Sequence, residues 1–198
     1  MHSKIVLASA SPRRQRMFND FEIEHTLFTA SIDETPLPAE QAHVFVKRVA
    51  GEKALAAATA YKLNNSRPFV VAADTVVVLD GNIMGKPVDT QDAQRMLRSL
   101  SGKTHSVLTG WAAGRLEDNF ILEVCETKVT FYPLDVETIK NYVETKEPMD
   151  KAGAYGIQEK GSFLIEKIEG SYLNVVGLPM EQVLRALKKL GAIDTIFK

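Results

Sequence analysis

Short apolar runs and helical patterns alternate along the first half of the chain. Residues 5–8 and 69–73 are continuous apolar runs, which is typical of strands that are buried on both faces. Residues 39–63 lack proline and are rich in Ala, Lys and Glu, so they predict a long helix. Gly51 interrupts this helix and marks either a close contact or a break between two shorter helices.

Antiparallel strand patterns appear in the second half. The dipeptide Asp80-Gly81 predicts a hairpin after the apolar run 76–79. Alternation of strands with helices early in the chain, followed by antiparallel pairs, predicts an α/β fold with a mixed sheet. The other predicted elements are strands within 21–28, 104–115, 120–132 and 163–168, and helices after Ser11 and at 90–100, 135–146 and 179–190.

Length and charge narrow the class of protein. A chain of 198 residues suits one large domain or two intimately packed lobes over residues 1–198. The formal net charge of −1 at pH 7 argues against a nucleic-acid partner, because nucleic-acid-binding domains carry a basic excess. Cys125 stands alone, which excludes an intrachain disulfide. No signal-peptide pattern and no membrane-spanning apolar run is present, so we expect a cytoplasmic protein without a membrane partner.

A candidate phosphate site follows the first apolar run. Ser11 suits the N-cap of a helix, and Arg13 and Arg14 come next, at the positive end of the helix dipole. Cations are unfavourable there unless an anion binds. The hydroxyls of Ser9 and Ser11 and the first helical amides would then hold phosphate oxygens, together with the two arginines. The alternative is an ordinary surface helix with solvated arginines.

Acidic and basic side chains elsewhere complete a candidate catalytic set. Asp74 directly follows an apolar run, where an unpaired carboxylate is costly to bury, so we expect it at the exit of its strand, facing a cleft, a cation or a metal. Asp33 and Glu34 lie in a loop and are oxygen ligands that suit Mg²⁺ beside Asp74. Lys53 and Lys86 would stabilise the charge of a departing phosphate group. Solvated surface charges are the alternative for both lysines and for the loop acids.

The loop at 150–158 is rich in residue types that contact ligands. Its glycines permit close approach of the backbone to a ligand. The amide of Gln158 is a planar donor–acceptor group that matches the N3–H and O4 of uracil or thymine. The alternative is a structural loop with Gln158 at the surface.

The common nucleotide-binding and hydrolytic motifs are absent. Residues 81–86 resemble a P-loop, but the spacing is one residue short and Pro87 stands at the Ser/Thr position. No Gly-x-Gly-x-x-Gly follows a strand, and no Gly-x-Ser-x-Gly is present. These function classes are therefore excluded.

Six blocks of residues, in order along nearly the whole chain, resemble the Maf family. The resemblance implies a nucleoside triphosphate pyrophosphatase, which cleaves between the α- and β-phosphates to give the monophosphate and pyrophosphate. It also implies the inosine triphosphate pyrophosphatase-like fold, an elongated mixed sheet with flanking helices and two lobes around a central cleft. A homodimer and a house-cleaning role in nucleotide metabolism are further expectations. The blocks are Leu7-Ala8-Ser9-Ala10-Ser11-Pro12-Arg13-Arg14, Ala72-Ala73-Asp74-Thr75, Gly85-Lys86-Pro87, Ser101-Gly102-Lys103-Thr104-His105-Ser106-Val107, residues 150–158, and Asn174-Val175-Val176-Gly177-Leu178-Pro179.

The resemblance also implies roles for individual residues. Asp74 takes the position of the proton acceptor, and a divalent cation such as Mg²⁺ or Mn²⁺ is required. By its chemistry Asp74 either activates the water or holds the metal that does so, and we expect Glu34 as the second acid around that metal. Arg13, Thr75 and Gln158 occupy the positions that track substrate choice. This combination is similar to the branch that acts on dTTP and UTP.

A nucleotide-binding regulator of septum formation or cell division, without significant turnover, is the competing expectation. The same phosphate-binding residues would serve binding alone. The carboxylates Asp74 and Glu34 and the two lysines favour turnover, because a protein that only binds a triphosphate does not need a carboxylate beside it.

One departure from the family pattern bears on the shape of the ligand-binding loop, since Glu159 stands where the family often has Gly.

Overall fold

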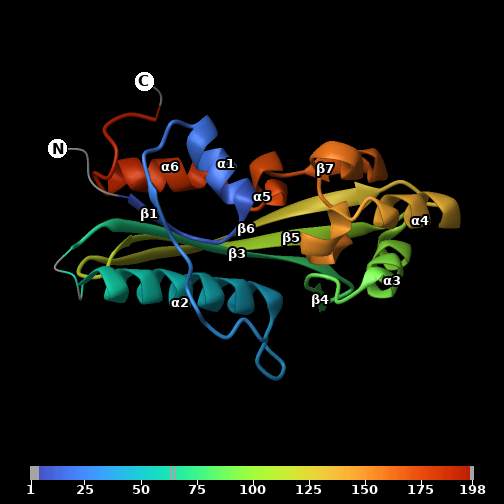
Figure 1. Ribbon diagram of the computed structural model, residues 1–198, viewed down its shortest axis with the longest axis horizontal. Helices are drawn as coiled ribbons and strands as arrows, with labels where there is room; N and C mark the ends of the chain where they lie inside the picture. The colour runs from blue at the N-terminus through green and yellow to red at the C-terminus, as the bar shows by residue number, and fades with distance from the viewer. Residues whose placement is uncertain (1–4, 63, 65, 197–198) are drawn as a thin grey trace. The chain divides into compact units, whose positions relative to one another are not determined.

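The computed structural model describes residues 5–62, 64 and 66–196, and within them seven strands form one mixed sheet (Figure 1). The strands are β1 (Ile5–Ala8), β2 (Thr26–Phe28), β3 (Phe69–Leu79), β4 (Asn82–Met84), β5 (Thr104–Arg115), β6 (Asn119–Phe131) and β7 (Ile165–Glu169). The helices are α1 (Pro12–Asp20), α2 (Ala42–Lys62), α3 (Thr90–Leu100), α4 (Val136–Glu144), α5 (Tyr172–Val176) and α6 (Met180–Lys189), with 3₁₀ turns η1 (Glu147–Asp150), η2 (Ala152–Ala154) and η3 (Glu159–Leu164).

The strand order is β2-β1-β3-β5-β6-β7, and β4 pairs with β3. The apolar run of β1 pairs in parallel with both β2 and β3, as expected for a strand buried on both faces. The pairs β3–β4 and β6–β7 are antiparallel. The predicted α/β fold with a mixed sheet and flanking helices is therefore confirmed. A strand is expected within residues 21–28, and the observed strand there is the shorter β2.

The described residues group into two compact units. The first comprises the described parts of Met1–Asp74, Thr109–Cys125 and Gly177–Lys198, and the second comprises Thr75–Leu108 and Glu126–Val176. Strand β3 begins in the first unit and ends in the second. Each unit has its own apolar cluster. No helix of the described chain is long and apolar enough to cross a membrane.

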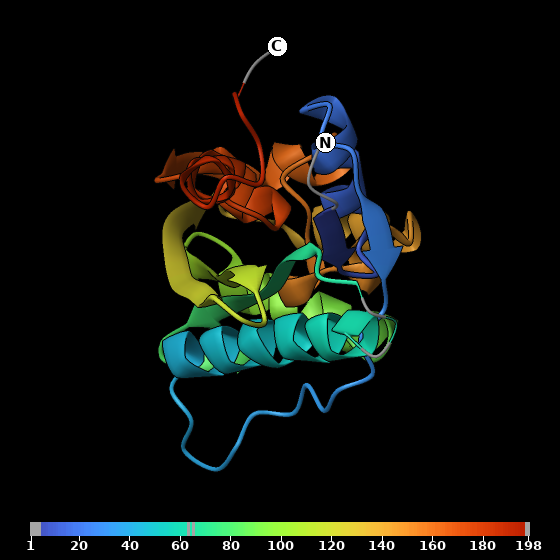
Figure 2. The same ribbon diagram turned by 90° about the vertical axis from the view of Figure 1, so that its left-hand side faces the viewer.

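Small residues let α2 lie close to the strands of the first unit. Ala54, Ala57 and Ala58 are buried against residues of β1, β3 and β5. At Gly110 of β5 the approach is so close that a Cβ would lie 2.1 Å from the carbonyl oxygen of Val46. A Cβ on Gly51 would lie 3.3 Å from Leu122 Cδ2. Helix α2 is continuous through Gly51 (Figure 2), so this glycine marks a close contact and not a break.

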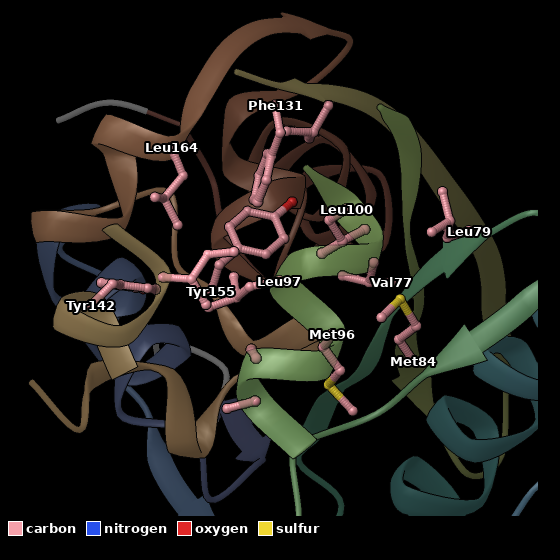
Figure 3. Packing of buried hydrophobic residues seen from close by; sticks show 14 of the residues in the cluster. Val77, Leu79, Met84, Met96, Leu97, Leu100, Phe131, Tyr142, Tyr155 and Leu164 are labelled. Carbon is pink, nitrogen blue, oxygen red and sulfur yellow. The ribbon is translucent and has the colours of Figure 1, made fainter. Parts of the chain in front are cut away.

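The second unit packs α3 and α4 around an aromatic group. Figure 3 shows Tyr155 and Phe131 at the centre of the cluster, beside Leu97 and Leu100 of α3. The rings of Phe131 and Tyr155 meet edge to face with centroids 4.7 Å apart. His105 joins them, and its Nε2 lies 2.7 Å from the hydroxyl oxygen of Tyr155. The cluster therefore anchors the loop that leads to Gln158, because Tyr155 is part of that loop.

The predicted hairpin after β3 is confirmed. Leu79 pairs with Asn82, so only Asp80 and Gly81 form the turn. Both have positive φ, 50° and 79°, which is the signature of a type I′ turn. The chain thus reverses immediately after the long strand.

Candidate active site

Asp74 lies inside β3 and not at the exit of a strand. The prediction placed it at a strand end, but β3 is continuous from Phe69 to Leu79. The pairing of β1 with β3 stops at Ala8 opposite Ala72, because β1 ends there. Asp74 is therefore two residues beyond the end of this pairing, and it is only 8% exposed. The carboxylate therefore lies beyond the end of the partner strand β1, while its own strand β3 continues.

Lys53 brings two carboxylates together. Its Nζ lies 2.9 Å from Asp74 Oδ1 and 2.9 Å from Glu34 Oε2. The side chains of Lys53 and Asp74 are buried, whereas that of Glu34 is 52% exposed. A buried charge is tolerated when it is paired, so the ammonium and the two carboxylates depend on one another. The structure thus joins three of the predicted site residues, contributed by α2, β3 and the segment before α2.

Asp33, the neighbour of Glu34, has a local role. Its Oδ1 accepts a hydrogen bond of 2.9 Å from the amide of Thr35. The hydrogen bonds from Thr35 lower the pKa of the Asp33 carboxyl below its usual value. Asp33 therefore shapes the turn that presents Glu34.

Arg14 is buried and braces the backbone around Asp74. Its Nε donates to the carbonyl oxygen of Gly177 at 2.8 Å, and its Nη1 donates to that of Ala73 at 2.9 Å. Nη1 also lies 3.3 Å from Ser9 Oγ. Burial lowers the pKa of the Arg14 guanidinium, and the nearby Asp74 carboxylate partly opposes this. At least two of its nitrogens are thus used within the protein, and its predicted binding of phosphate stays a prediction.

Ser9 and Ser11 shape the turn before α1. Ser11 is the N-cap residue, as predicted, but its hydroxyl makes no capping hydrogen bond. Its amide donates to Ser9 Oγ at 3.2 Å, so Ser9 receives both this amide and the Arg14 guanidinium. Arg13 follows in the first turn of α1 and is half-buried. The roles of Ser9, Ser11 and Arg13 in substrate binding stay predictions.

Three predicted site residues belong to the second unit. Thr75 follows Asp74 in β3 and is half-buried, and Lys86 is exposed in the turn between β4 and α3. That turn is tied to the Gln158 loop, because the amide of Gly153 donates to the carbonyl oxygen of Gly85 at 3.0 Å. Gln158 is half-buried between η2 and η3, and its side chain makes no capping hydrogen bond to η3.

The loop around Gln158 closes on Glu147, a residue that the sequence analysis missed. Oε1 of Glu147 accepts from the Tyr142 hydroxyl at 3.0 Å and from the Gly161 amide at 3.1 Å. The Tyr142 hydroxyl oxygen also accepts from the amide of Gly156 at 3.2 Å. Glu159 has a φ of 57°, which favours glycine and gives a physical reason for the family's frequent Gly at this position. No local pattern marks Glu147, since its partners lie in α4 and η3.

A second missed group holds the segment that carries Glu34. Arg48 of α2 forms a two-point ion pair with Glu40, with Nε–Oε1 and Nη2–Oε2 distances of 2.8 Å each. Arg48 also lies 3.2 Å from Glu52, one helical turn away. Only the contact between Arg48 and Glu52 could have been predicted from the sequence, by the i,i+4 spacing of opposite charges in a helix.

The oxygen donors at Lys53 suit a hard divalent cation. Asp74 and Glu34 both contact one ammonium, so their carboxylates lie within reach of a single cation. Mg²⁺ is bound by one or two carboxylates together with substrate phosphates. The described residues contain no group of three or more His, Cys, Asp or Glu side chains that could hold a metal. The donor set therefore fits a cation that binds together with a phosphorylated substrate.

Known proteins resemble this chain over nearly its whole length. A family model described as Maf-like protein matches residues 4–190. The dTTP/UTP pyrophosphatase of Geobacter sulfurreducens is 47% identical over 96% of this chain and 98% of its own. The protein of the same name from Acetivibrio thermocellus is 48% identical over 95% and 96%, and that from Myxococcus xanthus is 45% identical over 94% and 92%.

A solved structure shares the fold. The HAM1 protein from Coxiella burnetii superposes with a TM-score of 0.50 at 16% sequence identity, covering 94% of this chain and 99% of its own. This likeness concerns the fold. The family match and the curated relatives carry the assignment, and the chain belongs to the Maf family.

Proposed function

We propose that this protein is a nucleoside triphosphate pyrophosphatase that hydrolyses dTTP and UTP to the monophosphate and pyrophosphate. The relatives named dTTP/UTP pyrophosphatase, at 45–48% identity, support the reaction and the substrates. The observation that carries the proposal is the contact of Lys53 with both Asp74 and Glu34. A regulator that only binds nucleotides has no need for two carboxylates beside a triphosphate.

The described residues divide the work of hydrolysis. Asp74 accepts a proton from the attacking water as the bond between the α- and β-phosphates breaks. Lys53 orients Asp74 for this step, since its ammonium donates to Oδ1. Arg13 and Lys86 neutralise the charge that develops on the departing pyrophosphate. The oxygen of the water thus becomes part of the monophosphate, its proton passes to Asp74, and the pyrophosphate leaves as an anion.

A divalent cation such as Mg²⁺ or Mn²⁺ belongs to the proposal. Glu34 would hold it together with phosphate oxygens, with Asp74 as a second ligand if the cation and not Asp74 activates the water, and it would supply neutralising charge to the triphosphate. Without a cation, four phosphate charges would meet two carboxylates, and this repulsion opposes binding.

Base selection is assigned to Gln158, with Thr75 and Arg13 shaping the choice. A Gln amide donates to O4 and accepts from N3–H of uracil or thymine, whereas a carboxylate only accepts. Gln158→Glu should therefore raise the KM for dTTP and UTP more than that for a purine triphosphate. Glu159→Gln, which changes a charge at the next residue, is the matched control. An equal loss on all substrates would remove Gln158 from base selection.

Pyrophosphate release across a panel of nucleoside triphosphates, with and without Mg²⁺ or Mn²⁺, tests the reaction. We expect release from dTTP and UTP, only in the presence of a divalent cation, with the monophosphate as the other product. Tight binding of dTTP without release of pyrophosphate would instead support the regulator. A house-cleaning role predicts that modified pyrimidine nucleotides are also hydrolysed.

A further inference from the structure

The segment between β2 and α2 carries Glu34 without any regular structure. Figures 1 and 2 show that residues 29–41 leave the sheet and loop outward before α2 begins. Most of its side chains are exposed, including Glu34. Such a segment has high conformational entropy, so Glu34 meets Lys53 only if other contacts order the chain.

Arg48 supplies several such contacts. Its guanidinium reaches Glu40 through two nitrogens at 2.8 Å each, and Nη2 also donates to the carbonyl oxygen of Thr35 at 3.1 Å. Nη1 lies 3.2 Å from Glu52 Oε1, which ties the group to α2. One planar guanidinium, carried by a helix, therefore contacts the segment at Thr35, next to Glu34, and at Glu40, near its end.

Glu40 transmits this contact to the backbone. Its Oε2 accepts a hydrogen bond of 2.9 Å from the amide of Leu37, and its side chain is only 5% exposed. The paired Arg48 guanidinium lowers the pKa of the Glu40 carboxyl to about 2. The carboxylate thus stays charged throughout the working pH range. The Glu40 side chain is largely covered, while that of Arg48 is 23% exposed, so the ion pair is partly accessible to water.

We infer that Arg48 and Glu40 are positioning residues that hold the segment 33–40 against α2, so that Glu34 meets Lys53 and Asp74. This inference rests on the proposed function, because Glu34 matters there as an acid beside the substrate phosphates. Arg48 precedes Lys53 in the same helix. The helix therefore sets the distance between the anchor of the segment and the ammonium that receives Glu34.

Arg48→Gln tests the inference by removing the guanidinium while keeping a long polar side chain. We expect kcat for dTTP to fall about 10- to 100-fold, since small misplacements of catalytic groups cost rates of this order. The ratio of kcat/KM between dTTP and a purine triphosphate should not change, because base selection lies elsewhere. Arg95→Gln is the matched control, because it likewise removes an arginine that is paired with a carboxylate, here Asp92 within α3. Its kcat should equal that of the wild type.

Glu40→Gln tests the same pair from the other side. It keeps an oxygen for the Leu37 amide but removes the charged partner of Arg48, so its kcat should fall like that of Arg48→Gln. In an E34Q background, Arg48→Gln should add little further loss, because both changes then act through one carboxylate. Additive losses would show that Arg48 acts independently of Glu34 and would overturn the inference.

Hydrogen exchange gives a readout that needs no activity. The amides of Thr35 and Leu37 donate hydrogen bonds within the segment and should exchange about tenfold faster in Arg48→Gln, while those of α2 are unchanged. Unchanged exchange at these amides would overturn the inference alone. A normal kcat in E34Q would instead overturn the proposed role of Glu34 and, with it, the positioning role.

Discussion

A single ammonium organises the chemistry of the first unit at the scale of residues. Lys53 lies in a helix, yet both of its acidic partners come from outside that helix, one from β3 and one from an irregular segment. Asp74 is the more buried of the two carboxylates. A buried, oriented carboxylate is suited to take a proton, while an exposed one is suited to meet a cation and phosphate.

Asp74→Asn is expected to lower kcat by about 10²- to 10⁴-fold, the usual contribution of a general base. The amide has the size of the carboxyl and can still accept a hydrogen bond from Lys53, so the fold should persist. Pyrophosphate release measures the loss of kcat, and the far-UV circular dichroism spectrum checks that the fold persists. Asp80→Asn, in the exposed hairpin turn, is the control and should leave kcat unchanged. Near-normal turnover in Asp74→Asn would exclude Asp74 as the base.

His105 makes stability depend on pH. Burial lowers its pKa from 6.5 to about 4, and Nδ1 has no hydrogen-bond partner among the described residues. The unfolded chain therefore takes up a proton first as the pH falls below 6.5. Stability contributed by this neutral histidine is lost between pH 6.5 and 4, by roughly 3 kcal/mol in full.

Urea unfolding at pH 7 and pH 4.5 measures this dependence. The wild type should lose more stability over this interval than His105→Gln, in which the titrating group is absent. His43→Gln, at an exposed position of α2, should keep the wild-type difference. An equal pH dependence in wild type and His105→Gln would show that His105 is not the responsible group.

At the scale of elements, the contact between α2 and β5 limits which residues the chain accepts. Gly110→Ala would place a Cβ 2.1 Å from the carbonyl oxygen of Val46, in the backbone of a helix that also holds Lys53. Backbone atoms cannot rotate away, so α2 must shift, and overpacking of this kind costs about 1–3 kcal/mol or more.

We therefore expect Gly110→Ala to lower both the free energy of unfolding and kcat, because the shift of α2 carries Lys53 with it. Gly51→Ala is the contrasting variant, since its Cβ would meet only the end of the Leu122 side chain at 3.3 Å. The higher helix propensity of Ala offsets that contact. Thermal unfolding of both variants measures the difference, and equal melting temperatures would contradict the close approach at Gly110.

Several predicted elements differ from the observed ones where contacts with another strand determine the structure. The sequence predicts two runs on either side of Asp74, because a carboxylate interrupts apolar residues, yet β3 is one strand. Of the helix predicted at 39–63, the described residues form Ala42–Lys62, and position 63 lies outside the described residues. The glycine of this helix is explained by Leu122 of β6. Propensity and periodicity identify such elements, but a partner strand decides where a buried polar residue is allowed.

At the scale of the whole molecule, the proposed function links stability to ligands. A non-hydrolysable dTTP analogue with Mg²⁺ should raise the melting temperature more than either ligand alone, because each completes the binding site of the other. At a concentration 100 times Kd the stabilisation is about 2.7 kcal/mol. Differential scanning fluorimetry measures it, with a purine analogue as the control. Equal shifts with the analogue alone and with Mg²⁺ present would contradict joint binding of cation and phosphate.

The predicted homodimer belongs to the same scale and stays a prediction, as does the location in the cytoplasm. Sedimentation equilibrium of the purified protein checks the oligomeric state.

The sequence by itself predicted most of the strands and helices along the chain and proposed Asp74, Glu34 and Lys53 as site residues. It did so because apolar periodicity reports burial locally, and because charged residues beside apolar runs need partners. Only the tertiary structure decided which partners these are. It placed both carboxylates on Lys53, directed Arg14 to backbone carbonyls, and revealed Arg48 with Glu40. The physical reason is that ion pairs between distant segments depend on how a helix lies against its strands, which local pattern does not encode.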